Sequence, residues 1–155
     1  MSRHAMRLLE LKVPPVGVVA TVAALAWYVD QFAVLQWSES RLGAILWSAA
    51  GVFVAMAGFW SFARARTSVN PHRPGNASSL VTWGIYRVTR NPMYLGMLMV
   101  LIGWALFLGG ALPLFATGLF IPYMNRFQIE PEERVMAELF GDQFEQYVAT
   151  VRRWV

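Results

Sequence analysis

The residues best suited to chemistry lie where polar sequence runs directly into an apolar stretch, at positions 84–96. Asn91 followed by Pro92 predicts a helix start. Asn can cap free backbone N–H groups, and Pro at the first helical position gives up a donor that has no partner there. The partial positive charge of this helix end lies between Arg90 and Tyr94, which makes it a suitable place to hold an anion. On the local pattern alone, the simpler interpretation is favoured, in which Arg90 only anchors a membrane helix at the interface.

A second group of ionisable residues follows the last apolar stretch of the chain. Pro131 predicts the start of a helix whose first turn carries the acids Glu132 and Glu133. By themselves, such acids are better explained as complementing the dipole of a solvated helix. Gly141 then separates two short amphipathic helices, which would lie on the membrane surface and cover the cytoplasmic mouth of the bundle. Their apolar faces consist of Val135, Met136, Leu139, Phe140, Phe144, Tyr147, Val148 and Val151.

The composition is that of an integral membrane protein in one domain, residues 1–155. Of the 155 residues, 57% are hydrophobic and 14% are charged, whereas a soluble domain carries about 25% charged residues. The absence of cysteine excludes disulfides, thiolate metal sites and a cysteine nucleophile. No metal-binding cluster or phosphate-binding loop is visible in the sequence. We therefore expect membrane lipids as partners, and neither a metal nor a nucleic acid.

Apolar segments predict an all-α membrane protein with four transmembrane helices, of which two lie in the N-terminal part, residues 1–63. These first two spans are residues 13–35 and 42–62, each long enough for roughly 30 Å of hydrocarbon. Small residues in the second span would allow another helix to approach closely, although ordinary small residues of a membrane helix explain them equally well. They are Gly43, Gly51 and Gly58.

The second half of the chain is expected to form a loop, a hairpin and a tail. Residues 64–91 form a hydrophilic cytoplasmic loop rich in turn formers. The apolar part of residues 92–127 is too long for one crossing, because 35 residues at 1.5 Å each would span about 52 Å. A Gly-Gly pair and a following proline divide it into a helical hairpin with arms at 92–108 and 111–127. Residues 128–155 form the cytoplasmic tail with its short amphipathic helices.

The distribution of basic residues predicts the topology of these spans. By the positive-inside rule, the side that carries most of the basic residues faces the cytoplasm, and only Arg41 falls on the other side. We therefore expect a multi-pass protein of a bacterial inner membrane with both termini in the cytoplasm. Residues 1–12 would be retained, since no small-residue cleavage site follows the first apolar run. The cytoplasmic basic residues would be Arg3, Arg7, Lys12, Arg64, Arg66, Arg73, Arg87, Arg90, Arg126, Arg134, Arg152 and Arg153.

The two chemical elements occur together and in a fixed order. The first reads Gly-Ile-Tyr, then Arg-Asn-Pro-Met-Tyr-Leu-Gly, and the predicted membrane hairpin follows it. The second reads Glu-Glu-x-x-Met-x-x-x-Phe-Gly-x-x-Phe-x-x-Tyr. This ordered pair resembles the isoprenylcysteine carboxyl methyltransferase family, and it is similar to the related phospholipid N-methyltransferases. The resemblance extends over about residues 78–154.

The resemblance implies a membrane methyltransferase that uses S-adenosylmethionine (SAM) as its cofactor. The chain departs from the family's pattern at two positions. Members commonly have His in place of Asn91, and the substrate-orienting Arg of the isoprenylcysteine enzymes aligns with Gln128. Asn91 and the nearby Arg126 are therefore the candidate catalytic residues, with Arg126 expected to orient the acceptor. The implied cofactor contacts are Ser78, Ser79, Leu80, Val81, Tyr86, Asn91, Pro92, Met93, Tyr94 and Glu132.

The chemistry of methyl transfer is compatible with so few ionisable groups. A sulfonium methyl group is already activated, so the enzyme mainly has to align a nucleophile and exclude water. The acceptor would be a hydrophobic or lipid-like molecule, and carboxylate, amine and thiol nucleophiles all fit the pattern. One alternative is a catalytically inactive structural or assembly protein with the same fold, which the departures at Asn91 and Gln128 would suit. Another is a transport component, against which the lack of charged residues inside the spans argues.

Overall fold

The computed structural model describes residues 10–35, 40–65 and 79–155. Within these ranges the chain consists of helices and connecting turns, without a strand. The predicted all-α class is therefore confirmed. The predictions made for residues 1–9 and 66–77, and for Ser78, lie outside the described residues.

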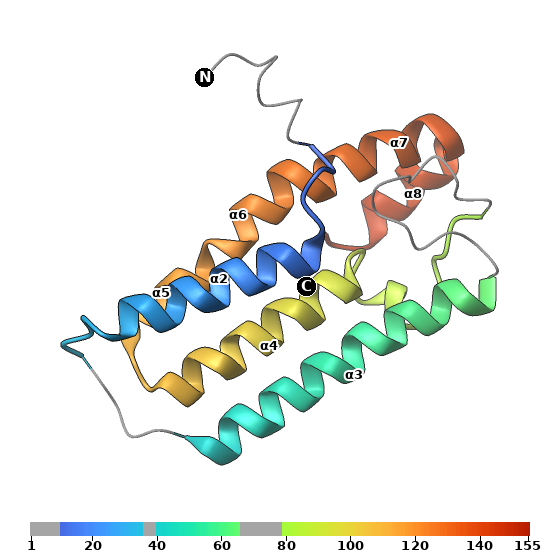
Figure 1. Ribbon diagram of the computed structural model, residues 1–155. Coiled ribbons are helices and arrows are strands. Elements are labelled where there is room, and N and C mark those ends of the chain that lie inside the picture. The colour runs from blue at the N-terminus through green and yellow to red at the C-terminus, as the bar shows by residue number, and fades with distance from the viewer. Residues whose placement is uncertain (1–9, 36–39, 66–78) are drawn as a thin grey trace, which may run out of the picture.

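Three helices run side by side and form the body of the molecule (Figure 1). They are α2 (Pro15–Asp30), α3 (Arg41–Ala65) and α4 (Pro92–Leu108). Helix α4 packs against both of the others. It begins at Pro92, as predicted, and it ends at Gly109, whose left-handed conformation (φ 76°) suits glycine. Helix α2 is shorter than the predicted span, because the chain turns after Asp30.

The second arm of the hairpin differs from the prediction. It runs through α5 (Ala111–Gly118), α6 (Phe120–Met124), a π-helical turn at Asn125–Ile129 and α7 (Glu130–Phe140). The arm predicted for residues 111–127 continues into the π turn, which ends at Ile129. The helix start predicted at Pro131 is confirmed to within one residue, because α7 begins at Glu130 and has Pro131, Glu132 and Glu133 in its first turn. Helix α7 ends at Gly141, and α8 (Asp142–Thr150) follows it, both as predicted.

Pro131 lies in this helical arm, two residues after the π-helical turn. Proline has no backbone N–H, so the carbonyl group four residues earlier, on Phe127, loses its usual partner. That carbonyl instead accepts a hydrogen bond from the backbone N–H of Leu11, at 3.0 Å. The carbonyl group of Phe127, in the π turn, therefore fastens the N-terminal segment to the helix.

Glycines allow α3 and α4 to touch along their backbones. A Cβ atom on Gly51 would lie 2.6 Å from the carbonyl oxygen of Gly96, and a Cβ atom on Gly58 would lie 2.9 Å from the ring of Pro92. Of the two interpretations left open for these glycines, close approach of another helix therefore holds for Gly51 and Gly58. The third, Gly43, would meet only the side chain of Ser40 in the preceding turn.

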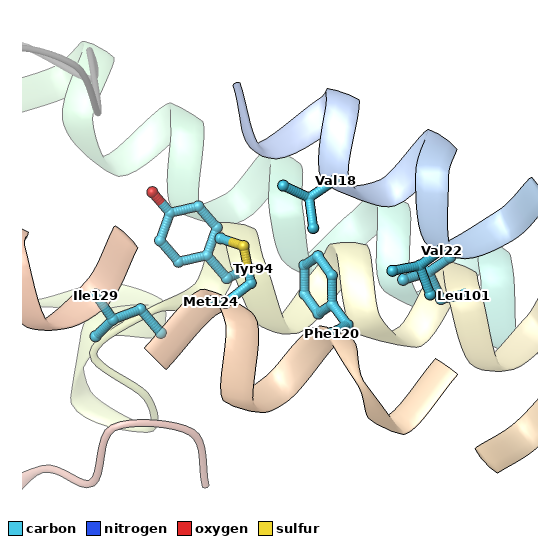
Figure 2. Close-up of a cluster of buried hydrophobic side chains, with 7 residues drawn as sticks. All are labelled: Val18, Val22, Tyr94, Leu101, Phe120, Met124 and Ile129. Atoms are coloured by element: carbon cyan, nitrogen blue, oxygen red, sulfur yellow. The ribbon is translucent and has the colours of Figure 1, made fainter. Parts of the chain in front are cut away.

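An apolar cluster joins α2, α4, α6 and the π turn. Figure 2 shows its buried side chains, which interdigitate between the helices. The ring of Tyr94 belongs to this cluster, but its hydroxyl group points away from the other labelled side chains. The core thus orients one polar group toward the end of the bundle. The members are Val18, Val22, Tyr94, Leu101, Phe120, Met124 and Ile129.

Helix α3 carries the strongest membrane signal in the described part of the chain. By length and composition, it is the one helix there that is long and apolar enough to cross a membrane, with 25 residues. Helices α2 and α4 are apolar but shorter. Much of the apolar surface of α3 is exposed, as is typical of a helix that faces lipid. The exposed side chains include Leu42, Ile45, Leu46, Trp47, Val52, Phe53, Met56, Phe59 and Trp60.

Candidate functional site

The candidate site is centred on a contact between the hairpin and the tail. The hydroxyl group of Tyr94, in the first turn of α4, donates a hydrogen bond of 2.6 Å to Oε1 of Glu132, in the first turn of α7. These two residues are 38 positions apart in the chain. The two sequence elements that predicted a common site therefore meet in space.

Tyr86 lies on a short 3₁₀ helix, Gly84–Arg87, near enough to Tyr94 and Glu132 to interact with both electrostatically. Its side chain is buried, and its ring packs edge-on against Phe62 at 5.3 Å. Its hydroxyl oxygen is buried without a hydrogen-bond partner among the residues that the structure describes. Burial, followed by the charges of Tyr147 and Glu132, raises the pKa of Tyr86 far above its ordinary value. Tyr86 is therefore a neutral donor with no partner in the described chain, close to the Glu132 carboxyl group.

Glu132 has an unusual protonation equilibrium. Burial raises its pKa from 4.5 to about 8; the hydrogen bond from Tyr94 opposes this shift, and the charge of Glu133 adds to it. The carboxyl group is therefore largely protonated at neutral pH. A cation placed beside it would favour the ionised form and lower its pKa.

The neighbouring Glu133 makes a different set of contacts. It accepts a hydrogen bond of 2.6 Å from Arg153, and it forms an ion pair of 3.0 Å with Arg90. Two basic residues thus hold one acid, while the adjacent Glu132 faces two tyrosines. Of the two acids of the motif, Glu133 therefore anchors the tail and Glu132 lines the candidate site.

Asn91 does not act as the predicted helix cap. Its side-chain nitrogen donates a hydrogen bond of 3.0 Å to the backbone carbonyl of Arg153, and it makes no capping hydrogen bond. Thr89 donates to the same carbonyl at 3.3 Å, and the backbone N–H of Arg90 donates to the carbonyl of Arg152 at 3.0 Å. The final turn of the chain is therefore docked against the start of α4.

The sequence reasoning missed this C-terminal docking. Trp154 contributes to it by donating a hydrogen bond of 2.9 Å to the side chain of Asn125 in the π turn. In the sequence, Arg152 and Arg153 stand out only as basic residues of the predicted cytoplasmic side. Every residue has a backbone carbonyl, so the sequence does not indicate that the carbonyl of Arg153 accepts these hydrogen bonds.

Several other predicted cofactor residues are close to the centre of the site. Pro92 and Met93 belong to the same helical turn as Tyr94. Val81 is buried with Tyr86 in a second apolar cluster, and Leu80 packs against this cluster. Ser79 precedes them in an extended stretch.

An open pocket lies next to this second cluster, between the extended stretch and α8. It has a volume of about 620 Å³. Tyr147 in its wall donates a hydrogen bond of 2.8 Å to the backbone carbonyl of Tyr86. The pocket thus reaches the segment that carries one of the three central side chains. Its lining is formed by Leu80, Thr82, Arg87, Gln143, Gln146, Tyr147, Thr150 and Val151.

Arg126, the predicted acceptor-orienting residue, lies in the π turn. It pairs with Glu10 at 2.7 Å and, more distantly, with Glu130 at 4.0 Å. Gln128, at the position of the family's Arg, is fully buried, and its side chain donates a hydrogen bond of 2.6 Å to the backbone carbonyl of Val13. Gln128 therefore fastens the N-terminal segment, while Arg126 is one-third exposed beside it.

The fold and the site together define a class of protein. The structure presents an apolar helix suited to lipid, a helical hairpin, and a buried acid–tyrosine site at the end of the bundle. Comparison with known proteins agrees with this class. A family model described as "Phospholipid methyltransferase" matches residues 38–143. That range contains all three central side chains.

This chain belongs to the phospholipid methyltransferase family, and the relation predicted from the two motifs is confirmed. Membership implies a membrane-associated methyltransferase. The chain is also similar to a protein of Haemophilus influenzae whose printed name is "Uncharacterized protein". The two are 41% identical over 63 residues, which is 41% of this chain and all of that protein. No solved structure matches.

Proposed function

We propose that this protein transfers a methyl group from SAM to a hydrophobic or lipid-like acceptor at the cytoplasmic face of a membrane. The observation that carries the proposal is the junction of Tyr94, Tyr86 and Glu132 at the end of the bundle. An ionisable carboxyl group suits the ammonium group or a ribose hydroxyl of SAM. The hydroxyl of Tyr86, which has no hydrogen-bond partner among the residues that the structure describes, could donate to a polar atom of a ligand.

When bound, SAM would supply an electrophilic methyl group on a sulfonium centre. Glu132 would bind the cofactor by a charge-assisted hydrogen bond. The buried rings of Tyr86 and Tyr94 would help to exclude water from the site. The docked C-terminal residues would hold Asn91 and the start of α4 in place. Arg126 would orient the polar head of the acceptor.

The direct test is to incubate membranes containing the protein with methyl-labelled SAM and to identify the labelled product by mass spectrometry. A labelled lipid or small hydrophobic molecule that depends on the protein is the expected result. An inactive protein of the same fold would give no label and would not bind SAM in calorimetry. Binding without transfer would contradict the proposed activity while leaving the cofactor site in place.

SAM affinity should rise with pH. Below pH 8 the ionised form of Glu132 must be generated before it can pair with a cation, because the pKa in the free protein is about 8. The affinity should increase by at most about tenfold per pH unit between pH 6 and 8, and then become constant. Calorimetry at several pH values measures this, with Glu132→Gln as the control that should lose the slope. A flat profile in the parent protein would contradict the role of Glu132.

Substitution of Arg126 by Lys should separate an orienting role from simple anchoring. Lys keeps the charge but lacks the planar fork that binds an anion through two donors. We expect Arg126→Lys to fold and bind SAM normally, and to lose most methyl transfer. An anchor would tolerate the change, since either cation reaches lipid head groups. Turnover near that of the parent protein would therefore reject the orienting role.

We further propose that four helices cross the membrane with both termini in the cytoplasm. Helices α2 and α4 have 16 and 17 residues, or about 24–26 Å of rise, so they would require a thin bilayer or a local adjustment of it. The support is the placement of twelve of the thirteen basic residues on one side. A fluorescent reporter fused after Val155 should be active in the cytoplasm. A reporter active only on the opposite side would reject this topology.

A further inference from the structure

Two arginines of the same helical arm hold one carboxylate of the N-terminal segment. Arg126 Nη1 lies 2.7 Å from Oε1 of Glu10, and Arg134 Nη2 contacts Oε2 of the same group. The Glu10 side chain is only 11% exposed, whereas those of Arg126 and Arg134 are 33% and 50% exposed. Each carboxylate oxygen thus has its own guanidinium, and both cations can be reached from outside.

The π-helical turn accounts for the convergence of the two arginines. In an uninterrupted α-helix, residues eight positions apart are rotated by about 80° relative to each other, since 3.6 residues make one turn. A π turn accommodates more residues per turn, and most of the π turn Asn125–Ile129 follows Arg126 on the way to Arg134. It therefore rotates Arg126 and Arg134 toward a common line on the helix.

The segment that carries Glu10 is held over the π turn at a conformational cost. Leu11 has a positive φ of 58°, which is unfavourable for a bulky residue. Its N–H group donates to the carbonyl of Phe127, and the carbonyl of Val13 accepts from Gln128. Strain in the backbone favours release, while the paired charges favour attachment. Such a segment can be displaced by an anion that binds the arginines better.

We propose that Arg126 and Arg134 form a binding site for a phosphate group, and that Glu10 occupies this site as an internal competitor. Two guanidinium groups bind the several oxygens of a phosphate more completely than the two oxygens of one carboxylate. A second carboxylate, that of Glu130, lies 4.0 Å from Arg126 and is shared with Arg153 at the same distance, so it neutralises Arg126 only in part. In the context of the proposed function, the phosphate would belong to a lipid at the mouth of the site. Free phosphate shares the same chemistry.

The test uses the detergent-solubilised protein and its thermal unfolding midpoint. Dioctanoyl phosphatidic acid is titrated against the parent protein, Glu10→Gln and Arg134→Gln. We expect Glu10→Gln to bind this lipid about tenfold more tightly, because the competing charge is gone, and Arg134→Gln to bind it at least about tenfold more weakly. Inorganic phosphate and dioctanoylglycerol are titrated in parallel to identify the group that is recognised.

The outcomes separate the alternatives. Phosphatidic acid binding more tightly than inorganic phosphate, with dioctanoylglycerol inactive, supports a lipid phosphate; equal binding of the first two supports a site for free phosphate. If dioctanoylglycerol stabilises the protein as well as phosphatidic acid does, or if Glu10→Gln does not tighten binding, the proposal is overturned and the ion pairs only fasten the chain. If Glu10→Gln does not fold, the test rests on Arg134→Gln alone, and unchanged binding of phosphatidic acid by this variant overturns the proposal. SAM binding, measured in the same samples, tests the proposed function independently.

Discussion

The variant Glu132→Ala should bind SAM more than tenfold more weakly than the parent protein, whereas Glu138→Ala should bind it normally. This expected result follows from their surroundings. Glu132 is partly buried and bonded to Tyr94, while Glu138 lies exposed on the same helix. The loss of a charge-assisted hydrogen bond costs about 1.5–3 kcal/mol, which is tenfold or more in affinity. Isothermal titration calorimetry in detergent provides the measurement.

A folding defect would have to be distinguished from a loss of binding. Glu132→Gln serves this purpose, because its amide oxygen can still accept the hydrogen bond from Tyr94. In the parent protein, the stability contributed by the raised pKa is present below the ordinary pKa of 4.5 and is lost as pH rises through about 8. Glu132→Gln removes this loss and should be at least as stable as the parent at pH 9, while still binding SAM weakly. If both substitutions weaken SAM binding equally and only slightly, Glu132 does not bind the cofactor and only complements the helix dipole.

Gly96→Ala should lower the unfolding midpoint by several degrees, although alanine is the better helix former. A Cβ atom there would overlap the carbonyl oxygen of Gly51 and would lie 2.7 Å from the backbone nitrogen of Ala55. The intrinsic helix preference for Ala over Gly is about 1 kcal/mol. Overpacking against a backbone costs about 1–3 kcal/mol and requires α3 and α4 to separate. The steric cost should therefore exceed the gain in propensity.

The control for this prediction is Gly118→Ala. The same chemical change is made there, but a Cβ atom on Gly118 meets nothing within 4 Å. Thermal unfolding of both variants in detergent should give a lower midpoint for Gly96→Ala and an unchanged or slightly higher one for Gly118→Ala. Equal midpoints would show that α3 and α4 do not depend on this backbone contact.

Local signals in the sequence predicted much of the fold. The start of α4 at Pro92, the stop at Gly141 and the close approach at Gly51 each depend on a conformational property of one residue, so they can be recognised without knowing the partner. The resemblance to the methyltransferase family also implied one site for Tyr94 and Glu132, and these two side chains are in contact in the structure. These features require only that chemical preferences be expressed locally.

The errors arose where distant contacts decided the outcome. Asn91 is a good helix cap in isolation, but its side chain bonds to the carbonyl of Arg153 instead. The π turn before α7 was not predicted, and the carbonyl of Phe127 in this turn accepts a hydrogen bond from the backbone N–H of Leu11. In both cases the hydrogen bond is formed with a partner more than sixty residues away in the chain, which no local sequence pattern predicts.

The docking of residues 152–154 has a consequence for biosynthesis. Ribosomes make a chain from its amino end, so Asn91 is synthesised 62 residues before the carbonyl group that holds it. Helices α3 and α4, by contrast, can associate as soon as both have been made. A nascent chain can therefore assemble its apolar scaffold first, and the pocket wall is completed only after residues 143–153 have been made. Under the proposed function, a cofactor that needs Glu132 and this pocket wall would stabilise the chain only after these late steps.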